Sequence, residues 1–186
     1  MNGGRDGTDH WLAQLDWLLA NDQAALARQH LAPDLLEDAP ELLQTEFKQH
    51  LICAQIALAT FQINRAELHA AEALRQIQTH AQCEYQADME ARAEQLLGKS
   101  LIALGRASEA EHHLTQAEKL LNGLVDTQRS PEFVDVVVAL GQCAVLRTQH
   151  DQAKMRLAQA QAIHATQPEL SDTFLAPLWA LQTALG

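Results

Sequence analysis

The sequence predicts an all-α protein, an α-solenoid of about four antiparallel helix pairs closed by a C-terminal capping helix. Composition is the first observation: Ala, Leu and Gln, which are good helix formers, make up almost half of the 186 residues. The second is the scarcity of loop and strand signals, with eight glycines, five prolines, four phenylalanines and one tyrosine. The third is an internal repeat, a pattern that indicates stacked helical units.

The repeat is marked by four similar dipeptides, each of which follows a polar turn signal and opens a segment of helical periodicity. They recur at intervals of 42, 44 and 43 residues: Gln23-Ala24, Arg65-Ala66, Glu109-Ala110 and Gln152-Ala153. After the third, Ala110, Leu114 and Ala117 follow at steps of four and three, which place them on one helix face. Upstream of the later three dipeptides is a small residue that lets a neighbouring helix approach closely: Ala54, Gly98 and Gly141. We therefore expect helix hairpins that stack and bury their Ala- and Leu-rich sides on one another.

The expected elements follow from these anchors and form a single domain over residues 1–186. The first pair covers 9–31 (helices 9–20 and 22–31), and the second 41–80 (helices 41–61 and 64–80). The third covers 84–123 (helices 84–104 and 107–123), the fourth 131–166 (helices 131–148 and 150–166), and the capping helix about 169–184. Asn122-Gly123 predicts a helix end, and Ser130-Pro131 a helix start with Ser130 as the N-cap.

Two of these units resemble the tetratricopeptide repeat, which favours an apolar and then a small residue in its first helix and an Ala–x3–large–x2–Ala frame in its second. The matching residues are Leu97-Gly98…Ala110…Leu114…Ala117 and Leu140-Gly141…Ala153…Leu157…Ala160. A looser match is Cys53-Ala54…Ala66…Ala70…Ala73, and the unit headed by Ala24 matches least. The resemblance covers roughly residues 9–166 and implies a right-handed superhelix. The period exceeds the family's usual length of about 34 residues, as in longer variants from bacterial sensor domains, and leaves an armadillo- or HEAT-like α-solenoid open.

The resemblance implies a non-catalytic scaffold, adaptor or regulatory module that binds a protein or peptide in a concave groove lined by the first helix of each pair. Its frame gives these polar groove candidates: Lys48, Gln55, Arg92, Gln95, Lys99, Asp135 and Gln142. Glutamine side chains both donate and accept hydrogen bonds, so the groove would suit an acidic or amide-rich segment. The alternative is a solvated helix face. A chaperone-type carboxylate clamp is not expected, because Leu51 and Gln55 lie near the places where it needs Lys and Asn.

Two other functions stay open at this stage: a ligand- or peptide-sensing regulatory domain, and a secretion-type chaperone. The sequence also leaves open a homodimer through the C-terminal helix, whose apolar face carries Phe174, Leu178, Leu181 and Leu185.

Charge and composition exclude several other classes. The net charge of −11 disfavours nucleic acid and anionic lipid as partners. There is no apolar run of membrane-spanning length and no signal-peptide pattern at the start, and Cys53, Cys83 and Cys143 fit reduced thiols, so a cytoplasmic protein is expected. Residues 1–42 carry a net charge of −6, which either steers a basic partner or keeps that end solvated.

No motif predicts catalysis, a cofactor or a metal. Gly98-Lys99-Ser100 is not a phosphate loop, because Ala93 occupies the position of the required glycine and the segment is helical. The nine histidines, including His69, His112 and His113, are interpreted as surface residues. Glu109 and Glu111 are interpreted as a solvated face rather than an acid–base pair.

Overall fold

The structure is a computed structural model. It describes residues 47–79, 86–124, 131–166 and 172–185, together with single positions at 14, 17, 18, 26, 27 and 29; side chains in the last helix are described from Ala176 onward. The chain divides into two compact units, Met1–His80 and Ala81–Gly186, and each is considered by itself.

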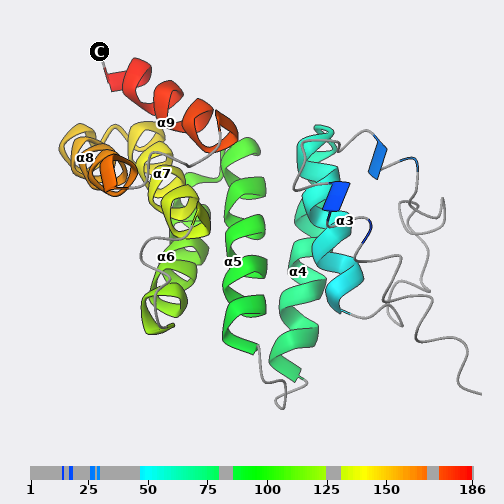
Figure 1. Ribbon diagram of the computed structural model, residues 1–186. Helices are drawn as coiled ribbons and strands as arrows, with labels where there is room; N and C mark the ends of the chain where they lie inside the picture. The colour runs from blue at the N-terminus through cyan, green and yellow to red at the C-terminus, as the bar shows by residue number, and fades with distance from the viewer. Residues whose placement is uncertain are drawn as a thin grey trace, which may run out of the picture. The chain divides into compact units, whose positions relative to one another are not determined.

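Each unit is built from antiparallel helices (Figure 1). The first contains α3 (Phe47–Ala59) and α4 (Ile63–Thr79). The second contains α5 (Gln86–Ala103), α6 (Ala107–Gly123), α7 (Pro131–Leu146), α8 (His150–Thr166) and α9 (Asp172–Leu185). All regular structure in the described ranges is helical, so the predicted all-α class is confirmed; assembly into one continuous solenoid stays a prediction.

The observed helices agree with the predicted ranges to within a few residues, and α6 and α8 agree at both ends. The predicted stop at Asn122-Gly123 is confirmed by the end of α6. Most of the predicted pair at 9–31, the expected N-cap Ser130 and the start of the helix expected at 41 fall outside the described residues. The described positions within 9–31 are helical.

The described residues form three hairpins, and one turn geometry joins the helices of each: α3 and α4 form the first, α5 and α6 the second, and α7 and α8 the third. At its centre is a residue in the left-handed region: Phe61 (φ 59°), Gly105 (φ 75°) and Thr148 (φ 58°). In each turn the amide of this residue donates to the carbonyl three residues back, and the next amide donates to the carbonyl five residues back, as in Gly105 to Ile102 and Arg106 to Leu101. This is the Schellman motif, which satisfies the last carbonyls of a helix.

The residue after the left-handed one also starts the next helix. The carbonyls of Gln62, Arg106 and Gln149 accept from the amides of Ala66, Ala110 and Ala153 respectively. Each hairpin therefore changes direction within a short turn of three residues between its helices. The three left-handed residues are 44 and 43 residues apart, the same intervals as those between the three alanines.

The predicted alanine face is buried in all three hairpins. Ala66, Ala110 and Ala153, and the alanines seven residues after each of them, have no exposed surface. Leu114 in α6 is also fully buried, whereas its counterpart Leu157 in α8 is partly exposed. This contact of small side chains brings the two helices of a hairpin close together.

Gly98 on α5 provides the closest of these contacts in the second hairpin. A Cβ atom added at Gly98 would lie 2.6 Å from Cγ of Leu114 and 3.3 Å from the carbonyl oxygen of Ala110. The predicted close approach of a neighbouring helix at this small residue is confirmed. The Leu114 side chain therefore fits at this position only because Gly98 has no side chain.

In the third hairpin the small residue accommodates a different helix. A Cβ atom added at Gly141 on α7 would lie 2.5 Å from Cδ2 of Leu181 on α9. α9 packs against both α7 and α8 and buries Leu178 and Leu181; its role as the cap of a solenoid stays a prediction. Among the described helices, none combines the length and the apolar character needed to cross a lipid bilayer.

Candidate functional site

The candidate binding residues lie on the first helices of the hairpins. Lys48 and Gln55 are on α3 in the first unit, so their placement is separate from that of the other five. Arg92, Gln95 and Lys99 are on α5, and Asp135 and Gln142 are on α7. Lys48 is exposed and Gln95 is buried, whereas the others are partly exposed.

Three of the candidates meet across α5 and α7. Nε2 of Gln95 donates a hydrogen bond to Oδ2 of Asp135 at 2.6 Å, and Nζ of Lys99 donates to the same oxygen at 2.7 Å. We call Gln95, Lys99 and Asp135 the amide-acid cluster. Gln95 and Lys99 are four residues apart, so they occupy one face of α5 and reach the same acceptor.

Solvent reaches the cluster from the lysine side. The side chain of Lys99 is 34% exposed and that of Asp135 is 13% exposed, while Gln95 is buried. The ion pair is therefore partly shielded from water, and its bonds are stronger than those of a fully exposed pair. The cluster fixes the positions of one cation, one anion and one amide at the surface of two adjacent helices.

The other candidates do not join this cluster. Gln142 is on α7, seven residues beyond Asp135 and therefore on the same side of that helix. The frame of the resembled repeat also assigns two apolar residues, Leu51 and Val138, to the groove, but both are almost completely buried. These two side chains belong to the core and are not available to a ligand, which corrects that part of the sequence interpretation.

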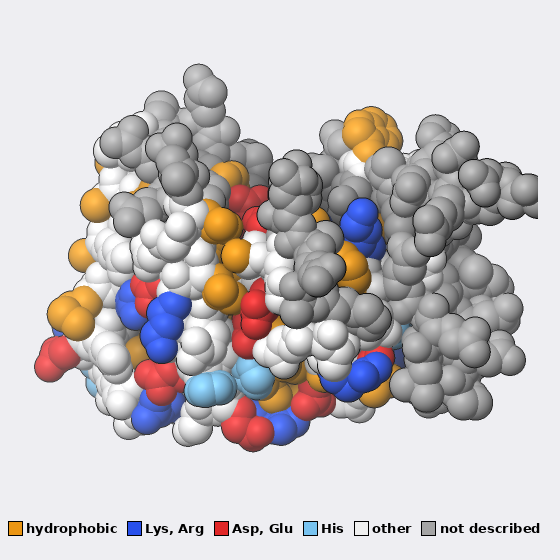
Figure 2. Space-filling model, turned by 90° about the horizontal axis from the view of Figure 1, so that it is seen from below, with side chains coloured by type: hydrophobic (Ala, Val, Ile, Leu, Met, Phe, Trp, Pro, Cys, Tyr) orange, Lys and Arg blue, Asp and Glu red, His pale blue; other side chains and the backbone are white. Residues whose placement is uncertain are grey.

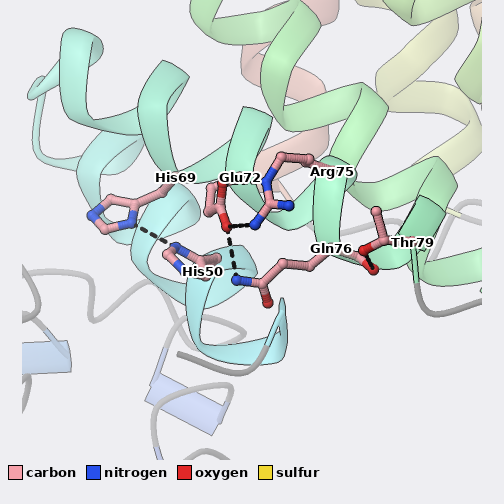
Figure 3. Close-up of polar contacts among 6 residues, drawn as sticks. All are labelled: His50, His69, Glu72, Arg75, Gln76 and Thr79. Atoms are coloured by element: carbon pink, nitrogen blue, oxygen red, sulfur yellow. Dashed lines mark hydrogen bonds and ion pairs between the residues drawn. The ribbon is translucent and has the colours of Figure 1, made fainter. Parts of the chain in front are cut away.

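The interpretation of the histidines as surface residues is wrong for the first hairpin. His50 on α3 and His69 on α4 are both buried, and their Nδ1 atoms are 3.1 Å apart (Figure 3). One of the two nitrogens must donate and the other accept, so the two rings hold different tautomers when both are neutral. The pair joins the two helices from inside the hairpin.

A second buried pair occupies the same positions in the second hairpin. Oε2 of Glu94 on α5 lies 2.6 Å from Nδ1 of His113 on α6, and the Glu94 side chain is 8% exposed. Both pairs consist of the residues 11 before and 8 after the left-handed turn residue. The two residues of each pair are 19 positions apart in the sequence. This shared spacing could have predicted the contacts, but it is recognised only when the hairpins are aligned on their turns.

Glu72 on α4 lies near the His50–His69 pair and should titrate at low pH. Hydrogen bonds from Arg75, together with one from Gln76, lower the pKa of the Glu72 carboxyl from 4.5 to about 2 (Figure 3). Because the folded-state pKa is depressed, the resulting stability is present above about pH 4.5 and is lost as the pH falls toward 2. We expect an NMR titration of the Glu72 carboxyl carbon to show a midpoint below 3; a midpoint near 4.5 would contradict the contact.

The stabilising effect of this contact is small. Arg75 is 55% exposed, so solvent screens the pair and its loss should cost little stability. The difference in unfolding free energy between the wild-type chain and Glu72→Gln should therefore shrink toward zero between pH 5 and pH 2.

The described cysteines fit the expectation of buried thiols. Cys53 and Cys143 are buried, and burial raises the pKa of each thiol to about 12. Cys83 lies outside the described residues.

Acidic and basic side chains are interspersed on the face seen in Figure 2, and the strongly acidic segment 1–42 lies outside the described residues except at single positions.

The leucine face of α9 is not available for dimer formation. Leu178 and Leu181 are buried within the chain, and the side chain of Phe174 lies outside the described residues. The exposed side of the helix includes Trp179, at 55% exposure. A homodimer through α9 stays a prediction and would have to use this side.

No protein-family model matches the chain, and searches of curated proteins and of solved structures likewise gave no match.

Proposed function

We propose that this chain is a tetratricopeptide-like α-solenoid that acts as a non-catalytic protein-interaction module. In this proposal a peptide segment of a partner protein lies along α5 and α7. The recurrence of one turn geometry at intervals of 44 and 43 residues supports the repeat architecture. The close packing at Gly98 supports it further, because the family places a small residue in the first helix of each unit.

The observation that carries the proposed binding site is the amide-acid cluster. It joins the first helices of two successive hairpins, which are the helices that line the groove in the proposed family. Its members keep some access to water through Lys99, and they offer both donors and acceptors at fixed positions. A pre-positioned polar group of this kind lowers the entropic cost of binding a flexible segment.

The proposal is tested by selecting 12-residue peptides from a random phage-displayed library on the immobilised chain. Selected peptides should bind Lys99→Met at least about tenfold more weakly than wild type, because the variant removes a charge-assisted donor worth about 1.5–3 kcal/mol. Lys154→Met is the control, since Lys154 is an exposed lysine on the second helix α8. It should leave the affinity unchanged.

Thermal unfolding of each variant shows whether lost binding reflects lost structure. Equal binding by wild type and Lys99→Met would exclude the cluster as the site. Selection of no peptide at all would contradict the proposed function as a whole.

A further inference from the structure

The amide-acid cluster has no net charge, and this restricts what it can bind. Lys99 supplies one positive charge, and Asp135 supplies one negative charge 2.7 Å away. A ligand carboxylate that reached the Lys99 ammonium would also meet the partly buried Asp135 carboxylate. A ligand ammonium would meet Lys99 in the same way. In each case repulsion offsets the attraction, while the cost of removing water from the ligand charge remains.

The hydrogen-bonding capacity that remains points to a group with both a donor and an acceptor. Both hydrogen bonds to the aspartate end on Oδ2, so within the described ranges Oδ1 of Asp135 has no hydrogen-bond partner. The Lys99 ammonium has three N–H groups, and one of them is used. The cluster therefore presents one acceptor and additional donors from atoms on adjacent helices.

The side-chain amide of Asn or Gln is an uncharged group that matches this pattern and carries its acceptor and its donors on two separate atoms. Its C=O accepts from an ammonium and the N–H on the same side donates to a carboxylate oxygen, so one such amide can engage Lys99 and Asp135 together. We infer that the cluster recognises an Asn or Gln side chain of the bound peptide and discriminates against a carboxylate. A backbone amide does not fit in the same way, because the C=O and N–H of a trans peptide unit point in opposite directions. This inference rests on the proposed function and selects the amide-rich segment over the acidic one.

The test uses one of the selected 12-residue peptides as a synthetic probe. Each Asn or Gln in the peptide is changed to Asp or Glu, and affinity for wild type is measured by isothermal titration calorimetry. One of these near-isosteric changes should weaken binding at least about tenfold.

The variant Asp135→Asn tests the reason for the selectivity. This substitution removes the negative charge and gives the cluster a net charge of +1, so the acidic peptide should regain affinity and the preference for the amide should fall at least about tenfold. Asp151→Asn is the matched control, because Asp151 is exposed on α8, and it should leave the preference unchanged.

Two outcomes would overturn this inference while leaving the proposed function intact. One is that peptides which depend on Lys99 bind wild type more tightly with the carboxylate than with the amide. The other is that none of the acid changes alters affinity. If no peptide depends on Lys99, the proposed site and this inference both fail.

Discussion

Changing Gly98 and Leu114 together to alanine is expected to cost much less stability than the sum of the two single changes. Leu114→Ala alone removes a fully buried leucine and should cost about 2–5 kcal/mol. Gly98→Ala alone places a methyl group 2.6 Å from Cγ of Leu114 and should cost about 1–2 kcal/mol, even after the gain in helix propensity. In the double variant the new methyl group occupies part of the space that the leucine leaves.

The first hairpin already contains this alanine pair. Ala54 and Ala70 occupy the positions equivalent to Gly98 and Leu114 when the hairpins are aligned on their turns, and both are fully buried. Chemical denaturation of the four chains gives the coupling energy, which we expect to be about 1–2 kcal/mol in favour of the double variant.

Gly123→Ala serves as the control for this series. A Cβ atom at Gly123 meets nothing within 4 Å, so this substitution should be neutral or slightly stabilising. Strictly additive losses at Gly98 and Leu114 would show that the two residues do not touch.

The second large effect is expected at the buried Glu94–His113 pair. His113→Leu leaves the Glu94 carboxylate in an almost water-free position without its donor, and this should cost about 2–3 kcal/mol. Glu94→Leu should cost less, because the His113 side chain is 25% exposed and can bond to water. The double variant with leucine at both positions should recover most of the loss, since no buried charge then remains.

Chemical denaturation at pH 7 measures these differences. His112→Leu is the control, because His112 is adjacent in sequence and exposed. If His113→Leu is no more costly than His112→Leu, the buried pair does not form.

The helices could be predicted from the sequence because alanine and leucine recur at steps of three and four in each of them. The left-handed residue of one turn could also be predicted at Gly105, since glycine adopts a positive φ without strain. The left-handed conformation of Phe61 and Thr148 could not be predicted, because aromatic and β-branched residues disfavour that region. Their turns were predicted from the polar residues beside them and from the repeat interval, and not from the left-handed residue itself.

The residues of the candidate site could be predicted from the sequence, but the hydrogen bonds that join them could not. The helical period places Gln95 and Lys99 on one face of α5, and the resemblance to a repeat family assigns Asp135 to the same side of the next first helix. Their convergence on a single oxygen depends on how far apart α5 and α7 lie, which is set by the packing of α6 against both of these helices. The buried histidine pair escaped prediction because histidine occurs more often at surfaces than in cores.

Stability measurements on three turn variants test most directly the claim that one hairpin recurs along the chain. Thr148→Gly and Phe61→Gly should each stabilise the chain by about 0.5–1 kcal/mol, because they remove the strain of a left-handed non-glycine residue. Gly105→Ala should destabilise it by about 1 kcal/mol for the opposite reason. Losses at all three positions, or no change at any of them, would contradict a shared left-handed turn and with it the repeat.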